Sequence, residues 1–321
     1  MAQTIEVTSD AIRSMDIAKI FKDHDSGINA LSFTDDSQYL LTSGEDKRLG
    51  VYKVDPGVLH KTKIDTTYGT ALVTATHHNS ACLYTNGCGE EHVVMYHNLT
   101  RETGMWTLRA HLAKVNCISV SPSSDIFLST SVDGKLYSSD LRQRRPVATC
   151  DFAREGVGYA AFDPTGVVYG LVHPEEGKTS IKLYDTRNAE VGPFKAKALD
   201  SCKEVRGFEF SDDGNLALVQ VSDSQIRLLD SMTLNSKQTL TRFTTPAGKT
   251  AAFSACSKYV LVSCAATRTA KVYEADSGRE VHSLRHESPA SSLVWSREYF
   301  LVATASNWLI LWVPDMMRTQ K

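Results

Sequence analysis

The sequence lacks the features of membrane and secreted proteins. No stretch of its 321 residues contains the run of about 18 apolar residues that a membrane-spanning helix needs. The N-terminal MAQTIEVTSD has no charged segment followed by an apolar stretch, so we expect no secretory signal. The net charge of −2 favours binding neither to nucleic acid nor to a membrane surface. We therefore expect a protein that contacts neither directly.

Cysteine pairs with metal-binding spacing and the common catalytic motifs are also missing. The seven cysteines form no CxxC pair, and no histidine lies at zinc-finger spacing from a cysteine pair. An odd number of cysteines in a chain without a secretory signal favours reduced thiols in the cytosol or nucleus. The sequence contains no Gly-x-Ser-x-Gly elbow, P-loop or HExxH motif. We predict no cofactor and no catalytic residue.

Long apolar stripes with the helical period are absent, so helix is expected to be rare. One short helical turn is predicted over Ala11–Met15, where Thr8-Ser9-Asp10 can act as a cap. Elsewhere, runs of five to seven residues rich in Val, Ile, Leu, Tyr and Phe alternate with clusters of Asp, Ser, Gly and Asn. This pattern predicts short strands joined by tight turns.

A unit of these strands recurs about every 43 residues. The last position of its first strand is found seven times, at Phe33, Thr76, Val120, Phe162, Phe210, Phe253 and Trp295. The intervals are 43, 44, 42, 48, 43 and 42 residues. A period of roughly 40–45 residues with four strands per unit is typical of a WD-type propeller. We therefore predict an all-β fold, a seven-bladed WD-repeat β-propeller that forms a single domain over residues 1–321.

The way in which the ring closes also follows from the repeats. The last unit supplies only three strands before the chain stops, whereas the strand-like segment Ile17–Phe21 precedes the first unit and has no partner there. An unpaired strand edge invites aggregation. We therefore predict that Ile17–Phe21 is the outer strand of blade seven, which would hold the two chain ends in one sheet.

The third unit contains most of a side-chain network that is found in WD repeats. In such repeats a histidine before the first strand bonds a serine or threonine on the second strand, and an aspartate and a tryptophan complete the network. His111, Ser131 and Asp133 match this pattern, and Ser139 stands at the tryptophan position. The first unit retains two members, His24 and Asp46. Because partly satisfied buried networks are costly, we expect this propeller to depend strongly on apolar packing.

His77 and His78 are the pair that most resembles a metal site. Adjacent residues on a strand point to opposite faces, so we expect the two rings to diverge and to be structural. We predict no metal site and no stoichiometric metal. Arg142, Arg144 and Arg145 form a basic cluster, which we interpret as a solvated loop.

The strand directions place the loops between blades and the turns between second and third strands on one rim. Basic residues from several blades should meet there, and we predict a partner-binding surface made of Lys114, Lys135, Arg154, Lys203 and Arg206. It would suit an acidic or phosphorylated peptide. The opposite rim should hold Asp35, Asp36, Asp212 and Asp213. The alternative is an ordinary surface of mixed charge.

Several longer stretches resemble one WD-repeat family. They are AIRSMDIAKIF (11–21), SPSSDIFLSTSVDGKLYSSDLR (121–142), AFDPTGVVYG (161–170), IKLYDTRNAEVGPF (181–194), FSDDGNLALV with QIRLLDS (210–231), the Tyr68-Gly69 pair and the closing LWVP (311–314). IRSMDIAKIF and YDTRNAEVGPF are the most specific. The chain is similar to the small propeller subunit shared by COMPASS-type histone methyltransferase complexes and by the PNUTS–type-1 phosphatase complex of transcription termination.

The resemblance implies a non-catalytic scaffold that is a monomeric subunit of a hetero-complex. Its expected location is the nucleus, at chromatin, and the cytoplasm is a second expected location. Its expected partners are a COMPASS-type methyltransferase, a PNUTS-like regulatory subunit with type-1 phosphatase, and the phosphorylated tail of RNA polymerase II. A rigid ring with loops on two faces offers several docking sites. Two alternatives remain open: a substrate receptor of a ubiquitin ligase, and a propeller enzyme with its site in the central channel.

Overall fold

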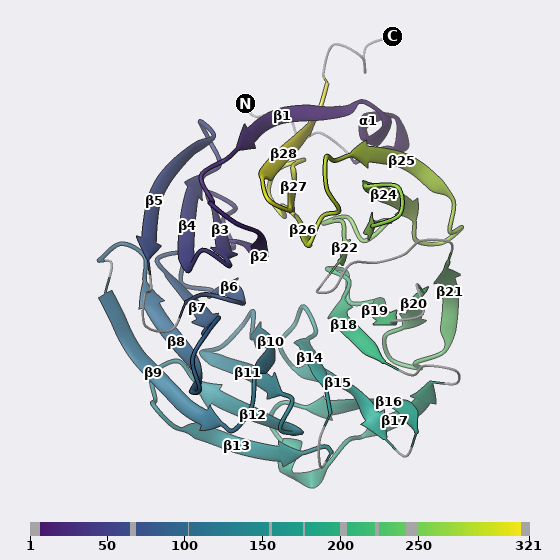
Figure 1. The fold of residues 1–321 in the computed structure, drawn as a ribbon. Helices are drawn as coiled ribbons and strands as arrows, with labels where there is room; N and C mark the ends of the chain where they lie inside the picture. The colour runs from purple at the N-terminus through teal and green to yellow at the C-terminus, as the bar shows by residue number, and fades with distance from the viewer. Residues whose placement is uncertain are drawn as a thin grey trace.

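Short strands and tight turns build seven four-stranded antiparallel sheets around a central axis (Figure 1). The structure is a computed structural model, and it describes residues 7–64, 69–101, 103–153, 156–175, 177–199, 204–221, 225–241 and 250–315. The seven-bladed WD-type propeller predicted from the repeat period is confirmed. Within the described ranges, no helix has the length and apolar character that crossing a membrane requires.

Each blade takes its four strands in chain order from the inside outward, except the last, whose outer strand comes from the N-terminus. The strands of blades one to three are β2 (Ile28–Phe33), β3 (Tyr39–Gly44), β4 (Arg48–Lys53), β5 (Val58–Ile64), β6 (Val73–Ala75), β7 (Ala81–Thr85), β8 (His92–Asn98), β9 (Thr103–His111), β10 (Val115–Val120), β11 (Ile126–Ser131), β12 (Lys135–Asp140) and β13 (Pro146–Asp151). Those of blades four and five are β14 (Tyr159–Phe162), β15 (Val168–Glu175), β16 (Lys178–Asp185), β17 (Lys195–Leu199), β18 (Val205–Phe210), β19 (Leu216–Val221), β20 (Gln225–Asp230) and β21 (Ser236–Leu240). Blades six and seven consist of β22 (Ala251–Phe253), β23 (Tyr259–Cys264), β24 (Thr269–Glu274), β25 (Glu280–Arg285), β26 (Ser292–Trp295), β27 (Val302–Ala305), β28 (Leu309–Pro314) and β1 (Met15–Phe21). The short helices are α1 (Ser9–Arg13) and η1 (Ala189–Val191).

The turns after the first strands show why the Asp-, Ser- and Gly-rich clusters recur. Gly166 and Gly214 have φ of 73° and 72°, a left-handed conformation that glycine adopts without a Cβ clash. In the second of these turns, the Ser211 hydroxyl donates to Asp213 at 2.6 Å and accepts from the Leu216 amide at 2.9 Å. Side-chain bonds of this kind close the hairpin and set the register of the strand that follows.

The core lies between neighbouring blades rather than inside any one of them. One cluster joins blades four and five through residues such as Ile181, Leu183, Phe208 and Val219. The whole of β19 and the whole of β23 are buried, as expected for strands covered on both faces. Each large aliphatic side chain buried there stabilises the fold by roughly 1.5–3 kcal/mol. Packing between blades therefore holds the ring together and fixes the positions of its loops.

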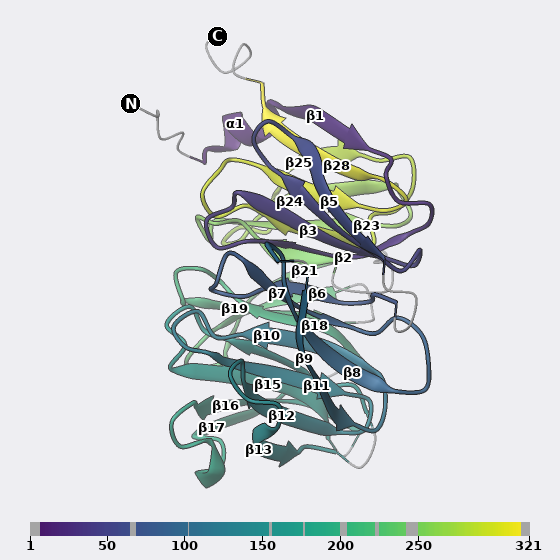
Figure 2. The same cartoon turned by 90° about the vertical axis from the view of Figure 1, so that its left-hand side faces the viewer.

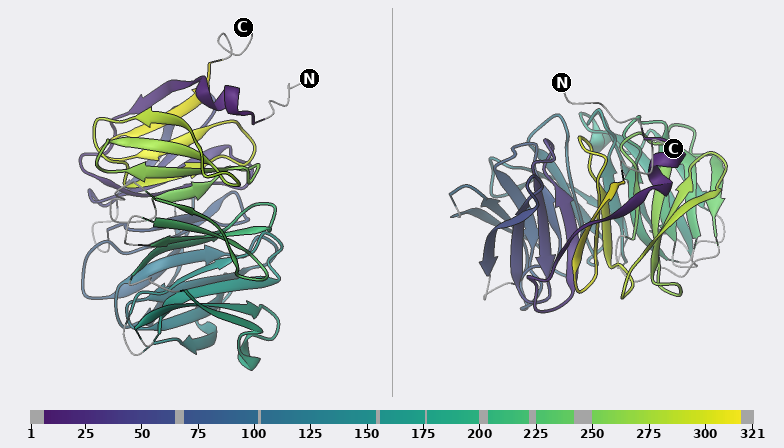
Figure 3. Two further views of the ribbon diagram at one scale, coloured as in Figure 1. Left: turned by 90° about the vertical axis from the view of Figure 1, so that its right-hand side faces the viewer. Right: turned by 90° about the horizontal axis from the view of Figure 1, so that it is seen from above.

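The two ends of the described chain meet in blade seven. Strand β1 pairs antiparallel with β28, with Met15 opposite Pro314 and Phe21 opposite Leu309. Helix α1 precedes it, and the Thr8 hydroxyl caps this helix by accepting from the Ala11 amide at 3.2 Å. Figures 1 and 3 show α1 and β1 lying against the outside of blades six and seven.

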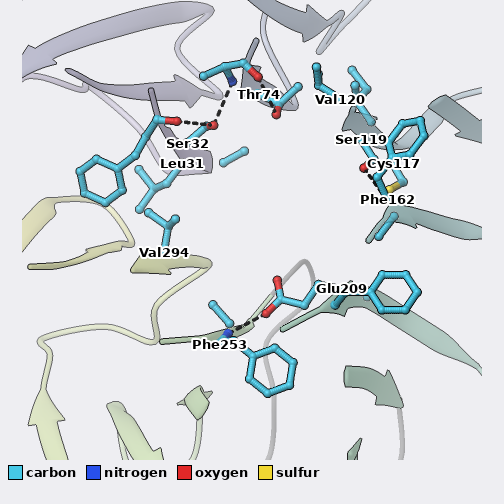
Figure 4. Close-up of a pocket in the computed structure, with 18 of the residues that line it drawn as sticks. Leu31, Ser32, Thr74, Cys117, Ser119, Val120, Phe162, Glu209, Phe253 and Val294 are labelled. Atoms are coloured by element: carbon cyan, nitrogen blue, oxygen red, sulfur yellow. Dashed lines mark hydrogen bonds between the residues drawn. The ribbon is translucent and has the colours of Figure 1, made fainter. Parts of the chain in front are cut away.

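A central channel of about 440 Å³ is lined by the innermost strands (Figure 4). Side chains there bond the backbone of the next blade one repeat along: the Ala75 amide donates to the Ser32 hydroxyl at 2.9 Å, and the Phe162 amide donates to Ser119 at 3.1 Å. Glu209 accepts from the Phe253 amide at 2.6 Å. This acidic side chain in the channel wall is therefore engaged in joining blades five and six.

Candidate partner-binding rim

The disc-shaped molecule has two faces, each bordered by the loops and turns that join the strands, and we call each such border a rim. The side view in Figure 2 shows the two faces at its edges. Three of the basic residues predicted to share a rim lie at or near the starts of strands that begin on the same side of the ring. Lys114 precedes β10, Lys135 begins β12 and Arg206 is the second residue of β18. We refer to Lys114, Lys135 and Arg206 as the basic rim. Arg154 and Lys203, which were predicted with them, lie outside the described residues.

Among the described residues, the acidic neighbours of the basic-rim cations are distant or exposed. Lys114 is exposed. Lys135 Nζ lies 3.9 Å from Asp151 Oδ1, and Arg206 Nη2 lies 3.9 Å from Glu204 Oε2. Exposed ion pairs typically contribute 0–1 kcal/mol, so these cations remain able to pair with an anionic ligand. Arg206 lies near the start of strand β18, and it also lines the central channel.

Two exposed apolar side chains beside these lysines were not predicted from the sequence. Leu112 is 80% exposed and Val132 is 38% exposed. The Val132 amide donates to the Lys114 carbonyl at 3.1 Å, so the two loops are in direct contact. Single exposed apolar residues are common on protein surfaces, but these two add apolar contact area next to the two lysines. The sequence could have indicated this, because in the segment HLAK (111–114) the apolar Leu112 falls in a loop between two blades.

A buried network beneath the rim holds these loops in place, but one member differs from the prediction. His111 Nδ1 lies 3.2 Å from Asp133 Oδ2, and His111 Nε2 lies 2.9 Å from the hydroxyl of Ser129 rather than Ser131. The Ser131 hydroxyl instead donates to the Ala113 carbonyl at 2.8 Å. The aromatic position is likewise Tyr137, whose ring centroid is 4.7 Å from that of His111, and not Ser139.

Both errors are shifts of two residues along a strand, for a simple reason. Side chains alternate between the faces of a strand, so Ser129 and Ser131 face the same side. Sequence alone cannot choose between them. The pairing of β11 with β12 does, because it places Ser129 opposite Tyr137.

The electrostatics of the network suit a fixed anchor. Burial lowers the pKa of His111, although Asp133 opposes this effect. Burial raises the pKa of Asp133, but bonds from the Leu112 and Lys135 amides and from His111 outweigh it, so the net pKa is lowered. A neutral imidazole that donates from Nδ1 and accepts at Nε2 satisfies both neighbours. Since Asp133 also accepts from the Leu112 and Lys135 amides at 2.9 and 3.0 Å, it links both rim loops to the network.

Other blades retain more of this network than the sequence suggested. Blade one has three members, since His24 contacts both Thr42 at 2.8 Å and Asp46 at 3.0 Å. In blade seven the indole N–H of Trp312 donates to Thr304 at 2.8 Å.

The acidic residues of the opposite rim are engaged within the protein. Arg297 lies 3.8 Å from Asp35 and 3.2 Å from Asp212, and so it links blade seven to blades one and five. Asp36 accepts from the Thr34 hydroxyl at 2.6 Å. Changing these acids would therefore disturb turns and ion pairs as well as surface charge.

The prediction that the rings of His77 and His78 diverge is wrong. The two residues lie in the bend between β6 and β7, where strand alternation does not apply, and their ring centroids are 4.0 Å apart. Both face Asp125 of blade three. The nearby Arg142 is solvent-exposed, in line with the interpretation of a solvated loop, and it also pairs with acids, 2.7 Å from Asp140 and 3.4 Å from Asp125.

Comparisons with known proteins agree with the fold. The WD domain, G-beta repeat family model matches residues 15–53 and 103–137. WD repeat-containing protein 82 of Drosophila melanogaster is 29% identical over 97% of this chain and 98% of its own length. Set1 complex component swd2 of Schizosaccharomyces pombe is 28% identical over 71% of this chain and 64% of its own length. COMPASS component SWD2 of Saccharomyces cerevisiae is 27% identical over 64% of this chain and 62% of its own length.

The seven four-stranded blades, the histidine networks and these similarities agree with the resemblance seen in the sequence. The chain is therefore a WD-repeat β-propeller protein that is similar over nearly its whole length to WD repeat-containing protein 82 and over about two thirds of its length to the Swd2 proteins.

Proposed function

We propose that this propeller is a non-catalytic scaffold subunit of a COMPASS-type histone methyltransferase complex, and that it acts in the nucleus at chromatin. The observation that supports this most is the similarity, over nearly the whole chain, to WD repeat-containing protein 82, together with relatives named as components of the Set1 and COMPASS complexes. A rigid ring whose loops are fixed by buried networks is suited to holding linear segments of larger proteins.

The basic rim is the proposed docking surface. Lys114 and Lys135 stand beside the exposed Leu112 and Val132, and the His111–Asp133 network holds both loops. Such a surface fits an acidic or phosphorylated segment that also carries an apolar side chain. Charge-assisted bonds to such a segment are each worth roughly 1.5–3 kcal/mol when desolvated and well aligned. Arg154 and Lys203 belong to the proposed surface by their sequence positions.

Finer assignments belong to the same proposal. Three proteins are candidate sources of the segment: the methyltransferase, a PNUTS-like regulatory subunit that brings type-1 phosphatase, and the phosphorylated tail of RNA polymerase II. All three offer linear segments, and the tail adds phosphate groups that match the cations of the rim. We propose the methyltransferase segment as the primary ligand, because the relatives' names point to that complex.

Affinity purification of the tagged full chain from nuclear extract, followed by mass spectrometry, tests this proposal. We expect histone methyltransferase subunits to be the most enriched proteins, in amounts comparable to that of the tagged chain. Recovery of ubiquitin-ligase subunits without any methyltransferase subunit would overturn it. A hydrolase or isomerase activity of the purified chain, abolished by changes in the channel, would instead establish the enzyme alternative.

A further inference from the structure

Two histidines and one aspartate from neighbouring blades meet on the rim opposite the basic rim. His77 and His78 come from the bend between β6 and β7, and Asp125 directly precedes β11. His77 Nε2 lies 3.1 Å from Asp125 Oδ1, and His78 Nε2 lies 3.2 Å from the same oxygen. One ligand atom from each residue falls within 4.8 Å of the others. Among the described residues, this is the one such group of three.

The backbone around these side chains is held in place. The His78 carbonyl accepts from the Ala81 amide at 2.9 Å and from the Thr76 hydroxyl at 3.1 Å. The Asp125 carbonyl accepts from the Leu141 amide at 2.8 Å. The three ligand atoms are therefore brought together by two closed turns rather than by mobile side chains alone.

Contrary to the expectation from the sequence that the chain has no metal site, we propose that His77, His78 and Asp125 bind a divalent transition-metal ion, with Zn²⁺ as the best fit. Imidazole nitrogen and carboxylate oxygen are zinc ligands, with bonds of about 2.0–2.2 Å. A tetrahedral ion with such bonds separates its ligand atoms by roughly 3.3–3.6 Å. The observed 3.1 and 3.2 Å need only a small outward shift to admit an ion. Three protein ligands leave a fourth position for water or for a ligand atom of a partner.

The surroundings point to an exchangeable site rather than a permanent one. His78 has a side chain that is 53% exposed, so the ion can enter from solvent. His77 Nδ1 has no hydrogen-bond partner among the described residues, and second-shell bonds normally strengthen a metal site. The Arg142 guanidinium lies 3.4 Å from the other Asp125 oxygen and competes for it. Binding would join blade two to blade three.

The test is titration of Zn²⁺ into the untagged full chain, freed of metal and kept reduced, followed by calorimetry. We expect one Zn²⁺ per chain. Removing one of three protein ligands in His78→Ala or Asp125→Asn should weaken binding at least about tenfold. His60→Ala, which removes an exposed histidine from β5, is the matched control and should bind like the unaltered chain.

Two further readouts separate binding at this site from binding by cysteine and from a folding defect. Cobalt(II) bound at this site should give d–d absorption without the charge-transfer band of a thiolate ligand, which distinguishes it from cobalt held by cysteine thiols. Zn²⁺ should raise the Tm of the unaltered chain and of His60→Ala but not of His78→Ala, which is expected to fold because its side chain is half exposed. Binding of equal strength in His78→Ala, a thiolate band, or no stoichiometric Zn²⁺ in the unaltered chain would overturn the proposal. If the unaltered chain binds no stoichiometric Zn²⁺, the side chains of His77, His78 and Asp125 are joined by hydrogen bonds only.

Discussion

At the scale of single residues, the structure separates side chains that the sequence treats as equivalent. Ser129 and Ser131 are both buried serines on the same face of β11. Only Ser129 meets His111, whereas Ser131 closes the adjacent loop through Ala113. The two serines therefore contribute to stability through different partners, and mutation can distinguish them.

A pair of double-mutant cycles tests this assignment by urea unfolding. His111→Ala and Ser129→Ala should couple by at least about 0.5 kcal/mol, because each removes the hydrogen-bond partner of the other. His111→Ala and Ser131→Ala should couple more weakly, because no hydrogen bond joins these two side chains and their link runs through Asp133, which bonds His111 and whose amide donates to the Ser131 hydroxyl at 3.2 Å. Equal coupling in both cycles would mean that Ser129 is not the preferred partner of His111.

A second prediction concerns pH and His286. Burial lowers the pKa of His286 to about 4, and neither ring nitrogen has a hydrogen-bond partner among the described residues. In the unfolded chain the pKa is about 6.5, so between about pH 6.5 and 4 the unfolded state binds a proton that the folded state does not. The contribution of the neutral His286 to the free energy of unfolding is therefore fully present above about pH 6.5. It falls by roughly 3 kcal/mol towards pH 4.

Urea unfolding of His286→Leu over this pH range checks the prediction. The variant keeps an apolar side chain against Trp312 and should be at least as stable as the unaltered chain at pH 7. Its stability should fall less steeply towards pH 4, with the other buried histidines still contributing. A slope identical to that of the unaltered chain would show that His286 reaches solvent.

At the scale of elements, strand β1 joins the N-terminal segment to the last blade. It pairs with β28, and its Phe21 ring packs 4.8 Å from Tyr52 of blade one. Ile12 in the preceding helix is fully buried in the same cluster as Trp312. This N-terminal segment thus contributes a β-ladder and apolar packing to the closure of the ring.

Deletion of residues 1–21 should cause aggregation or a clear loss of cooperativity in thermal unfolding. The deletion leaves the edge of β28 unpaired, and open edges recruit other chains. Deletion of residues 1–6 is the matched control, because it spares α1 and β1, and it should leave the melting curve unchanged. Unaltered, cooperative melting after the larger deletion would show that β1 is dispensable.

At the scale of the whole molecule, the two rims differ in the state of their charges. The acids of one rim are used internally, as in the pairs of Arg297 with Asp35 and Asp212. On the basic rim, Lys135 and Arg206 each form a long ion pair of 3.9 Å within the part of the chain that the structure describes, and Lys114 is exposed beside apolar groups that also face solvent. The basic rim is therefore the surface that we expect partners to use.

Reversing three charges tests which rim binds partners. Lys114→Glu, Lys135→Glu and Arg206→Glu together should weaken binding of the methyltransferase segment at least about tenfold, because each aligned charge-assisted bond is worth roughly 1.5–3 kcal/mol. Fluorescence anisotropy with a labelled peptide measures the change. The double variant without Arg206→Glu, which spares the neighbourhood of Glu204, guards against a folding defect.

The matched control reverses three exposed cations of the opposite rim, Lys53, Arg144 and Lys258, in a second triple variant. It should bind the peptide normally. Surface substitutions of this kind usually change stability by about ±0.5 kcal/mol each, so both variants should fold. Loss of binding in the control but not in the basic-rim variant would move the docking surface to the opposite rim.

The sequence by itself determined the repeat, the number of blades and the strand-and-turn pattern, because apolar runs and Gly- or Asp-rich turns are local signals. It also pointed to Ile17–Phe21 as the outer strand, and the structure pairs Met15–Phe21 with β28. Only the tertiary structure decided which serine meets His111, since residues two apart share a strand face. The contact of His77 and His78 with Asp125 also depended on the bend of one turn and on the packing of a neighbouring blade. Neither can be inferred from local sequence patterns, because the contact joins residues more than 40 positions apart.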